Sequence, residues 1–196
     1  MKIFTYAALA ALLFAGTGCS NFSHKKTAAA STVPVPKPVP NPPPKHSFWN
    51  GDAVTGAALI QIVLSQQRAY FFKGEQLVGA SVISSGKKGF ETPPGTYKVI
   101  QKDKKHVSNL YGDYVDDEGA VVQANVDISK DPKPEEAVAF VGAKMPNFLR
   151  FTGGYGMHAG HLPGYRASHG CVRMPGAMAA HFFDATEIGM PVIVQP

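Results

Sequence analysis

Short hydrophobic runs separated by turn residues dominate the chain after residue 58 and predict β-strands. The runs LIQIVL, QRAYFF and LVGASVISSG lie between residues 59 and 86, and the polar turn KGEQ separates the second from the third. Runs of this length that are rich in β-branched and aromatic residues are typical of strands joined by short turns. We therefore expect strand, strand, turn and strand in succession.

The same alternation of strands and loops continues toward residue 136. The stretch GKKGFETPPG predicts a loop, and TYKVIQK predicts a strand after it. The stretch DYVDDEGAVVQ predicts a hairpin that turns around Glu118 and Gly119, and SKDPKPEEA predicts a polar loop. The acidic residues of the hairpin lack the ligand spacing of a Ca²⁺ loop, so we interpret them as a solvated turn.

One helix is predicted near the end of the chain. Pro175 suits a helix start and Gly189 a helix end, while Met178, Phe182 and Ala185 fall on one helical face. The run MPVIVQ then predicts a final strand. Many short strands with one late helix predict an all-β sandwich or barrel with one or two short helices.

The N-terminus has the pattern of an export signal. An apolar run from Ile3 to Ala15 follows Lys2 and is too short to span a bilayer. The run ends in Gly16-Thr17-Gly18-Cys19, which resembles a bacterial lipobox. Residues 1–18 are therefore expected to be a lipoprotein signal peptide, and Cys19 the lipidated residue; a plainly secreted protein is the alternative.

Residues 19–46 are expected to form a lipid-anchored tether, with the folded domain at residues 47–196. Seven of the 16 prolines lie in STVPVPKPVPNPPPK, and proline favours extended polyproline II. Such a segment would act as a spacer between a membrane and the domain. If Cys19 carries lipid, Cys171 has no disulfide partner, so it is expected to be either reactive or deeply buried.

The net charge of +5 does not describe the folded domain. Five of the 19 Lys and Arg residues precede Ser47, and the remaining 14 balance the 14 Asp and Glu residues. A domain that is near neutral lacks the basic surface that nucleic-acid binding requires, so we exclude nucleic acid as a partner. The basic tail either keeps the tether soluble or contacts anionic lipid headgroups.

The stretch MHAGHLPGYRASHGCVRMP, residues 157–175, contains three histidines and Cys171. A free thiol needs a base or a cation to become a thiolate at neutral pH. His158, His169 and Arg173 can supply these, and the Gly170 and Cys171 amides can donate to an oxyanion. These residue types predict a cysteine nucleophile.

Two other interpretations of this stretch stay open from the residues alone. His158, His161, His169 and Cys171 are all possible zinc ligands. However, no second cysteine and no nearby carboxylate supports such a site. A buried structural thiol is the other alternative.

The same stretch resembles the signature of the L,D-transpeptidase catalytic domain, also called the YkuD domain. That signature has an upstream histidine, here His158, and a Ser-His-Gly-Cys string, here residues 168–171, followed by Val172 and Arg173. The block SSGKKGFETPPGTYKV resembles a second family block, and IVLSQQRAYFFKGEQLV its first hairpin. The resemblance covers Leu59 to Val194, and it implies a β-sandwich or barrel.

The resemblance also implies roles for the site residues. Cys171 would be the nucleophile, and His158 the general base, oriented by a backbone carbonyl at Ala159. The Gly170 amide would join that of Cys171 in an oxyanion site, and His169, beside the thiol, would shape the site or tune the thiolate rather than act as the main base.

Four further residues are expected to contact substrate or to order the loop around it: Arg173, Ser168, Tyr155 and Tyr165. Ser168 suits loop ordering, and Arg173 suits a substrate carboxylate or the thiolate. His161 is interpreted as a loop residue. Arg166 stands where family members often have proline. The segment 102–150 resembles the family weakly, and its role stays open.

By this resemblance the protein is a peptidoglycan L,D-transpeptidase without cofactor or metal. Cys171 would attack the third-residue carbonyl of a stem tetrapeptide, release the terminal D-amino acid and transfer the acyl group to an amine. Water as acceptor would make it an L,D-carboxypeptidase, and a protein lysine would give wall anchoring. A non-catalytic wall-binding lipoprotein is the other alternative. The expected location is the periplasmic side of the cell envelope, on the outer membrane because Ser20 follows Cys19.

Overall fold

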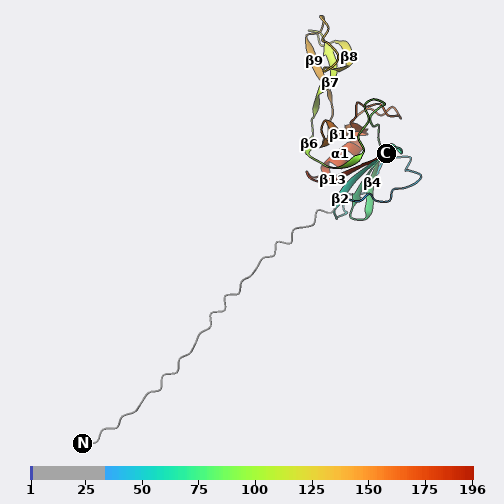
Figure 1. The fold of residues 1–196 in the computed structure, drawn as a ribbon, viewed down its shortest axis with the longest axis vertical. Helices are drawn as coiled ribbons and strands as arrows, with labels where there is room; N and C mark the ends of the chain where they lie inside the picture. Colours follow the sequence, from blue (N-terminus) through green and yellow to red (C-terminus); the bar gives the residue numbers. More distant parts are fainter. Residues whose placement is uncertain (2–33) are drawn as a thin grey trace. The chain divides into compact units, whose positions relative to one another are not determined.

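The structure is a computed structural model that describes Met1 and residues 34–196. Residues Pro34–Pro196 form one compact unit (Figure 1). The predicted signal peptide and Cys19 lie outside the described residues. Among residues 34–196, no helix has the length and hydropathy needed to cross a membrane.

A six-stranded sheet forms the base of the unit, in the order β1-β4-β3-β2-β13-β5. All neighbours in it are antiparallel except β13 and β2, which are parallel. The predicted strand–strand–turn–strand succession is confirmed. Its strands are β1 (Phe48–Trp49), β2 (Ala58–Val63), β3 (Arg68–Lys73), β4 (Gln76–Val82), β5 (Gly95–Lys98) and β13 (Pro191–Gln195).

A second sheet of four strands packs on the base sheet, in the order β12-β11-β10-β6. Leu149, Phe151, Met157, Val172 and Met174 point from it into the main core, where they meet Ile60, Ile62 and Phe71 of the base sheet. Since strand side chains alternate between faces, the residues between them point away from the core. The strands are β6 (Gln101–Asp103), β10 (Phe148–Thr152), β11 (Tyr155–Ala159) and β12 (Val172–Met174).

Helix α1 (Gly176–Asp184) closes the main core. Met178 and Phe182 are buried in it, as their spacing predicts, and Pro175 occupies the N-cap. The helix ends five residues before Gly189, so the predicted end was wrong. Its last turn tightens through a Thr186 N–H bond to Phe183 O, and Gly189 instead provides a positive φ of 89° in the turn before β13. The predicted all-β class with one short helix is confirmed.

A third sheet, in the order β8-β7-β9, stands out from the rest of the unit (Figure 1). Its strands are β7 (Val107–Val115), β8 (Val121–Asp127) and β9 (Ala139–Lys144), and its small core contains Tyr114, Val126 and Ala137. The predicted hairpin around Glu118 and Gly119 joins β7 to β8. We call this sheet the flap, and it accounts for most of the segment whose role the sequence left open.

The described part of the proline-rich segment lies against the base sheet. The Lys37 N–H donates to the Gln61 side chain at 2.8 Å, and Gln61 Nε2 donates back to Lys37 O at 3.0 Å. Further along, Arg68 Nε donates to Pro44 O at 2.9 Å. Proline keeps the segment extended, so its free peptide groups are available to these side chains. Residues 34–46 therefore contact the domain.

Replacing Gln61 with leucine should release this segment. Gln61 is 1% exposed, and the substitution removes both hydrogen bonds to the Lys37 peptide. We expect the Lys37 amide, which has a proline on each side, to exchange with solvent at least tenfold faster in a deuterium-exchange experiment. Glu75→Gln is the matched control, since it removes only the exposed Lys37–Glu75 ion pair. Unchanged Lys37 exchange in Gln61→Leu would contradict this anchoring.

Candidate active site

The outward face of the four-stranded sheet places side chains from four strands in one row. Asp103 of β6 pairs with Phe148 of β10, and His158 of β11 pairs with Arg173 of β12. The Phe148 and His158 rings connect these pairs, with centroids 6.3 Å apart. The row therefore runs Asp103, Phe148, His158, Arg173 across the sheet, one strand spacing of about 4.8 Å at each step.

A second row lies beside the first and ends at Cys171. Arg150 of β10 pairs with Gln101 of β6 and with Gly156 of β11. Cys171 directly precedes β12, whose first residue pairs with the residue after Gly156, so Cys171 lies beside Gly156. Gly156 has no side chain, and a Cβ there would lie 2.5 Å from the Phe148 ring, so the Phe148 side chain covers this position. The parallel pairing of β11 and β12 thus brings Cys171 and His158 to one face.

The Cys171 thiol is held in its neutral form in the resting site. Its Sγ lies 3.6 Å from Gly154 O, a geometry in which the thiol donates. Burial raises the pKa of Cys171, while the Gly156 backbone N–H and the guanidinium groups of Arg150 and Arg173 lower it. Burial has the largest effect, and the two arginines are placed to stabilise a thiolate once it forms.

His158 is neutral and has one defined tautomer. Its Nδ1 lies 2.9 Å from Ala159 O, the backbone partner that the family resemblance implies, and this prediction is confirmed. A carbonyl only accepts, so Nδ1 carries the proton and Nε2 keeps a free lone pair. Burial lowers the pKa of His158 from 6.5 to about 4. Nε2 is therefore the ring nitrogen of His158 that is able to accept a proton.

The loop before Cys171 is held by the second sequence block, residues 84–99. Ser84 exchanges two backbone hydrogen bonds with Arg173, and Ser85 O accepts the Ser168 N–H at 3.1 Å. Thr92 is buried, and its hydroxyl accepts from Gly86 N–H at 3.0 Å and donates to Gly170 O at 2.7 Å. The two sequence blocks that resemble the family, residues 84–99 and 157–175, are thus in contact.

Gly170 is required by its conformation and by its neighbour. Its φ is +114°, and a Cβ there would lie 2.5 Å from the Tyr155 ring. Its N–H donates to Ser168 Oγ at 3.0 Å, and that hydroxyl donates to Cys171 O. The predicted oxyanion role of the Gly170 amide is therefore not supported, which leaves the Cys171 N–H of the expected pair. Ser168 is buried and orders the loop.

His169 connects the loop before Cys171 to the flap. Its imidazole stacks on Tyr111 of β7 with centroids 4.7 Å apart, and Phe90 meets it edge-on at 4.7 Å. Lys130, which follows β8, lies over the Phe90 ring at 4.9 Å. Burial and the nearby Lys87 lower the pKa of His169. His169 therefore acts as a packing contact between this loop and the flap.

A cavity of about 610 Å³ lies between the flap and the outward face of the sheet. The predicted residues His158, Cys171, Arg173 and Tyr155 line it, and Ser168 and His169 reach it as well. Sequence reasoning missed the lining residues that come from the flap and from the segments at its base, among them His106, Tyr111 and Arg150. The alternation in the run NFLRFT could have indicated that Phe148 and Arg150 share a face.

The remaining predicted loop residues are more peripheral. Tyr165 is 65% exposed and does not line the cavity, so its predicted substrate contact is not supported by the structure. Arg166 donates to Leu64 O at 2.9 Å and ties the loop to the end of β2. His161 lines the cavity from the loop after β11. Among residues 34–196, no three His, Cys, Asp or Glu side chains gather as metal ligands.

Replacing Thr92 with valine should loosen the loop before Cys171. The substitution keeps the shape of the side chain but leaves Gly86 N–H and Gly170 O without their buried partner. Each unpaired group typically costs about 1–3 kcal/mol of folding stability. We expect a lower urea midpoint and faster hydrogen exchange at Gly86. Thr55→Val, at an exposed position, is the control. A variant as stable as the parent would show that Thr92 does not hold this loop.

The buried neutral His158 should make the protein less stable in acid. The unfolded imidazole has a pKa of 6.5 and the folded one about 4, so below pH 6.5 the unfolded state binds the proton more readily. Stability from this group is unchanged above pH 6.5 and falls by about 3 kcal/mol as the pH drops to 4.

Urea unfolding at pH 7.5 and 4.5 tests this effect. His158→Gln should lose most of the difference attributable to the imidazole, whereas His46→Gln, at an exposed position, should behave as the parent. Equal pH dependence in parent and His158→Gln would contradict the burial of a neutral imidazole. Carboxylates with lowered pKa values, such as Asp127, contribute equally to all three proteins.

Comparison with solved structures shows which known folds this chain resembles. The chain is similar in structure to an L,D-transpeptidase from Mycobacterium smegmatis, with a TM-score of 0.55 and 22% identity over 71% of this chain and 59% of the other. A second, from Stackebrandtia nassauensis, gives 0.52 and 17% identity over 73% and 57%. A third, from Xylanimonas cellulosilytica, gives 0.51 and 24% over 72% and 62%.

These likenesses show the fold, and the chain spans about three fifths of the length of the solved chains. Comparison with curated proteins gave no match. The sequence pattern described as YkuD, the L,D-transpeptidase catalytic domain, matches residues 57–194. This match covers both linked sequence blocks and every residue of the two rows. The chain therefore belongs to the YkuD family of L,D-transpeptidase catalytic domains.

Proposed function

We propose that this protein is a peptidoglycan L,D-transpeptidase that uses Cys171 as its nucleophile and His158 as its base. One observation carries the proposal: β11 and β12 lie in parallel and present both side chains to the same 610 Å³ cavity. The Arg150 and Arg173 guanidinium groups act on the same thiol. A peptidoglycan substrate fits the family to which the chain belongs.

Acylation begins from a neutral thiol and a neutral imidazole. His158 Nε2 takes the thiol proton as sulfur attacks the carbonyl of the third stem residue, and the arginines stabilise the thiolate as it forms. The Cys171 N–H is the candidate donor to the oxyanion. His158 then returns its proton to the departing amine, so the terminal D-amino acid leaves and a thioester remains on Cys171.

In the second half-reaction an acceptor resolves the thioester. An amine forms a new amide bond and expels the Cys171 thiolate, which gives a crosslink. A protein lysine as acceptor would anchor that protein to the wall, and water would yield a tripeptide. The export signal of residues 1–18 and the lipobox-like Cys19 support action at the cell envelope, where a lipid anchor would hold the domain near its substrate.

Incubation with defined tetrapeptide muropeptides, followed by mass spectrometry, tests the function. The parent should release one D-amino acid for each acyl transfer and form crosslinked dimer. Cys171→Ala should lose at least about a thousandfold in rate, because no other nucleophile replaces the thiolate. Its thermal unfolding should match that of the parent, which separates lost chemistry from lost folding. Equal dimer formation by both proteins would overturn the proposal.

A further inference from the structure

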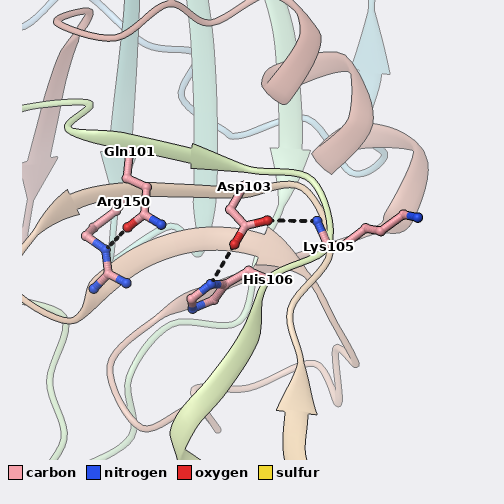
Figure 2. Close-up of polar contacts among 5 residues, drawn as sticks. All are labelled: Gln101, Asp103, Lys105, His106 and Arg150. Atoms are coloured by element: carbon pink, nitrogen blue, oxygen red, sulfur yellow. Dashed lines mark hydrogen bonds and ion pairs between the residues drawn. The ribbon is translucent and has the colours of Figure 1, made fainter.

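A second histidine lines the cavity and has no part in the scheme above. His106 lies between β6 and β7, at the base of the flap, and its Nδ1 is 3.1 Å from Asp103 Oδ2 (Figure 2). Its imidazole stacks on Phe148 with centroids 4.2 Å apart, and the same Phe148 ring lies beside His158. Phe148 thus separates two histidines that line the same cavity.

Asp103 is held as a carboxylate. It accepts the Lys105 backbone N–H at 3.0 Å through Oδ1 while Oδ2 faces His106. These two bonds lower the pKa of Asp103. The Lys105 side chain extends away from the imidazole, and Arg150 is directed to Gln101 rather than to Asp103 (Figure 2). The carboxylate is therefore free to stabilise a positive charge on His106.

The two histidines share a tautomer but differ in their partner. Nδ1 of each meets an oxygen that only accepts, so each keeps the lone pair on Nε2. The partner of His158 is a neutral carbonyl, and burial holds its pKa at about 4. The partner of His106 is instead a carboxylate, 3.1 Å from Nδ1. Of the two histidines, His106 is the one in contact with a carboxylate, so the charge of a proton that its Nε2 takes from a basic group would be balanced by a charge-assisted hydrogen bond.

The amine that accepts the acyl group is a basic group of this kind. A side-chain amine is an ammonium ion at neutral pH and cannot attack the thioester until it loses a proton. Asp103 lies two strands from His158 in the row that ends at Arg173. The Asp103–His106 pair therefore lies on the side of the cavity away from β12, the strand that follows Cys171. An ammonium that approaches from this side meets a carboxylate–imidazole pair before it meets the thioester.

Resting on the proposed function, we propose that His106, oriented by Asp103, is the base that deprotonates the acceptor ammonium in the second half-reaction. His106 Nε2 takes one proton from the ammonium, and the freed amine nitrogen bonds to the thioester carbonyl carbon. The C–S bond then breaks, and the second amine proton passes through His158 to the leaving thiolate. The products are the amide, the Cys171 thiol and a His106 imidazolium that returns its proton to solvent.

The full-length protein and two variants test this role. His106→Gln keeps a donor for Asp103 but cannot take a proton, and Asp103→Asn removes the charge that stabilises the imidazolium. His46→Gln, exposed and outside the cavity, is the matched control. With a tetrapeptide muropeptide as donor, release of the D-amino acid and thioester mass on Cys171 report acylation. Dimer formation with a tripeptide acceptor reports aminolysis.

We expect His106→Gln to acylate within about twofold of the parent, and its aminolysis to fall by about 100-fold, the lower end of the range for general acid–base catalysis. Asp103→Asn should show a smaller loss in the same step. The thioester should accumulate in both variants. Hydroxylamine, which is uncharged at neutral pH, should resolve the thioester of parent and His106→Gln at equal rates.

The outcomes separate the two proposals. If the parent forms no thioester, the proposed function fails. If the parent forms thioester and dimer but His106→Gln retains the parent's aminolysis rate, the role of His106 is overturned. If acylation, aminolysis and the hydroxylamine reaction all fall together, His106 only supports the fold, and the role is overturned as well.

Discussion

The parallel pairing of β12 with β11 is the constraint on which the site depends. Parallel neighbours in register present their side chains to the same face, so Cys171 and Arg173 point with His158 toward the cavity. Val172 and Met174 point the other way and are buried in the main core. The same alternation therefore anchors the strand and aims the thiol, and a slip of one residue would exchange the two sets.

Desolvation sets the chemistry of the resting site. Burial raises the pKa of the thiol and lowers that of His158, so both groups stay neutral until a substrate arrives. Arg150 and Arg173 oppose this effect on the thiol. A neutral thiol is less open to oxidants, which attack the thiolate form, and the two arginines lower the pKa that burial raises.

Two parts of the protein hold the loop before Cys171. The buried Thr92 hydroxyl donates a hydrogen bond to Gly170 O, and Tyr111 of the flap stacks on His169. The spacing of hydrophobic residues predicted the strands, because burial of one or both faces of a strand leaves a repeating pattern in the sequence. It could not predict the flap's contact with the loop, since that contact joins segments about 60 residues apart without any local signal.

The sequence by itself determined the strand-rich class, the hairpin at Gly119 and the buried helix face that contains Phe182, because these depend on local spacing. The pairing of His158 with Cys171 was an expectation from the resemblance to a family signature. Only the tertiary structure decided that the Gly170 amide is taken by Ser168 and that Tyr165 stays outside the cavity. It also decided that Asp103 and His106 face the same space as Cys171. Those outcomes follow from strand register and buried hydrogen bonding between distant segments, which no single stretch of sequence records.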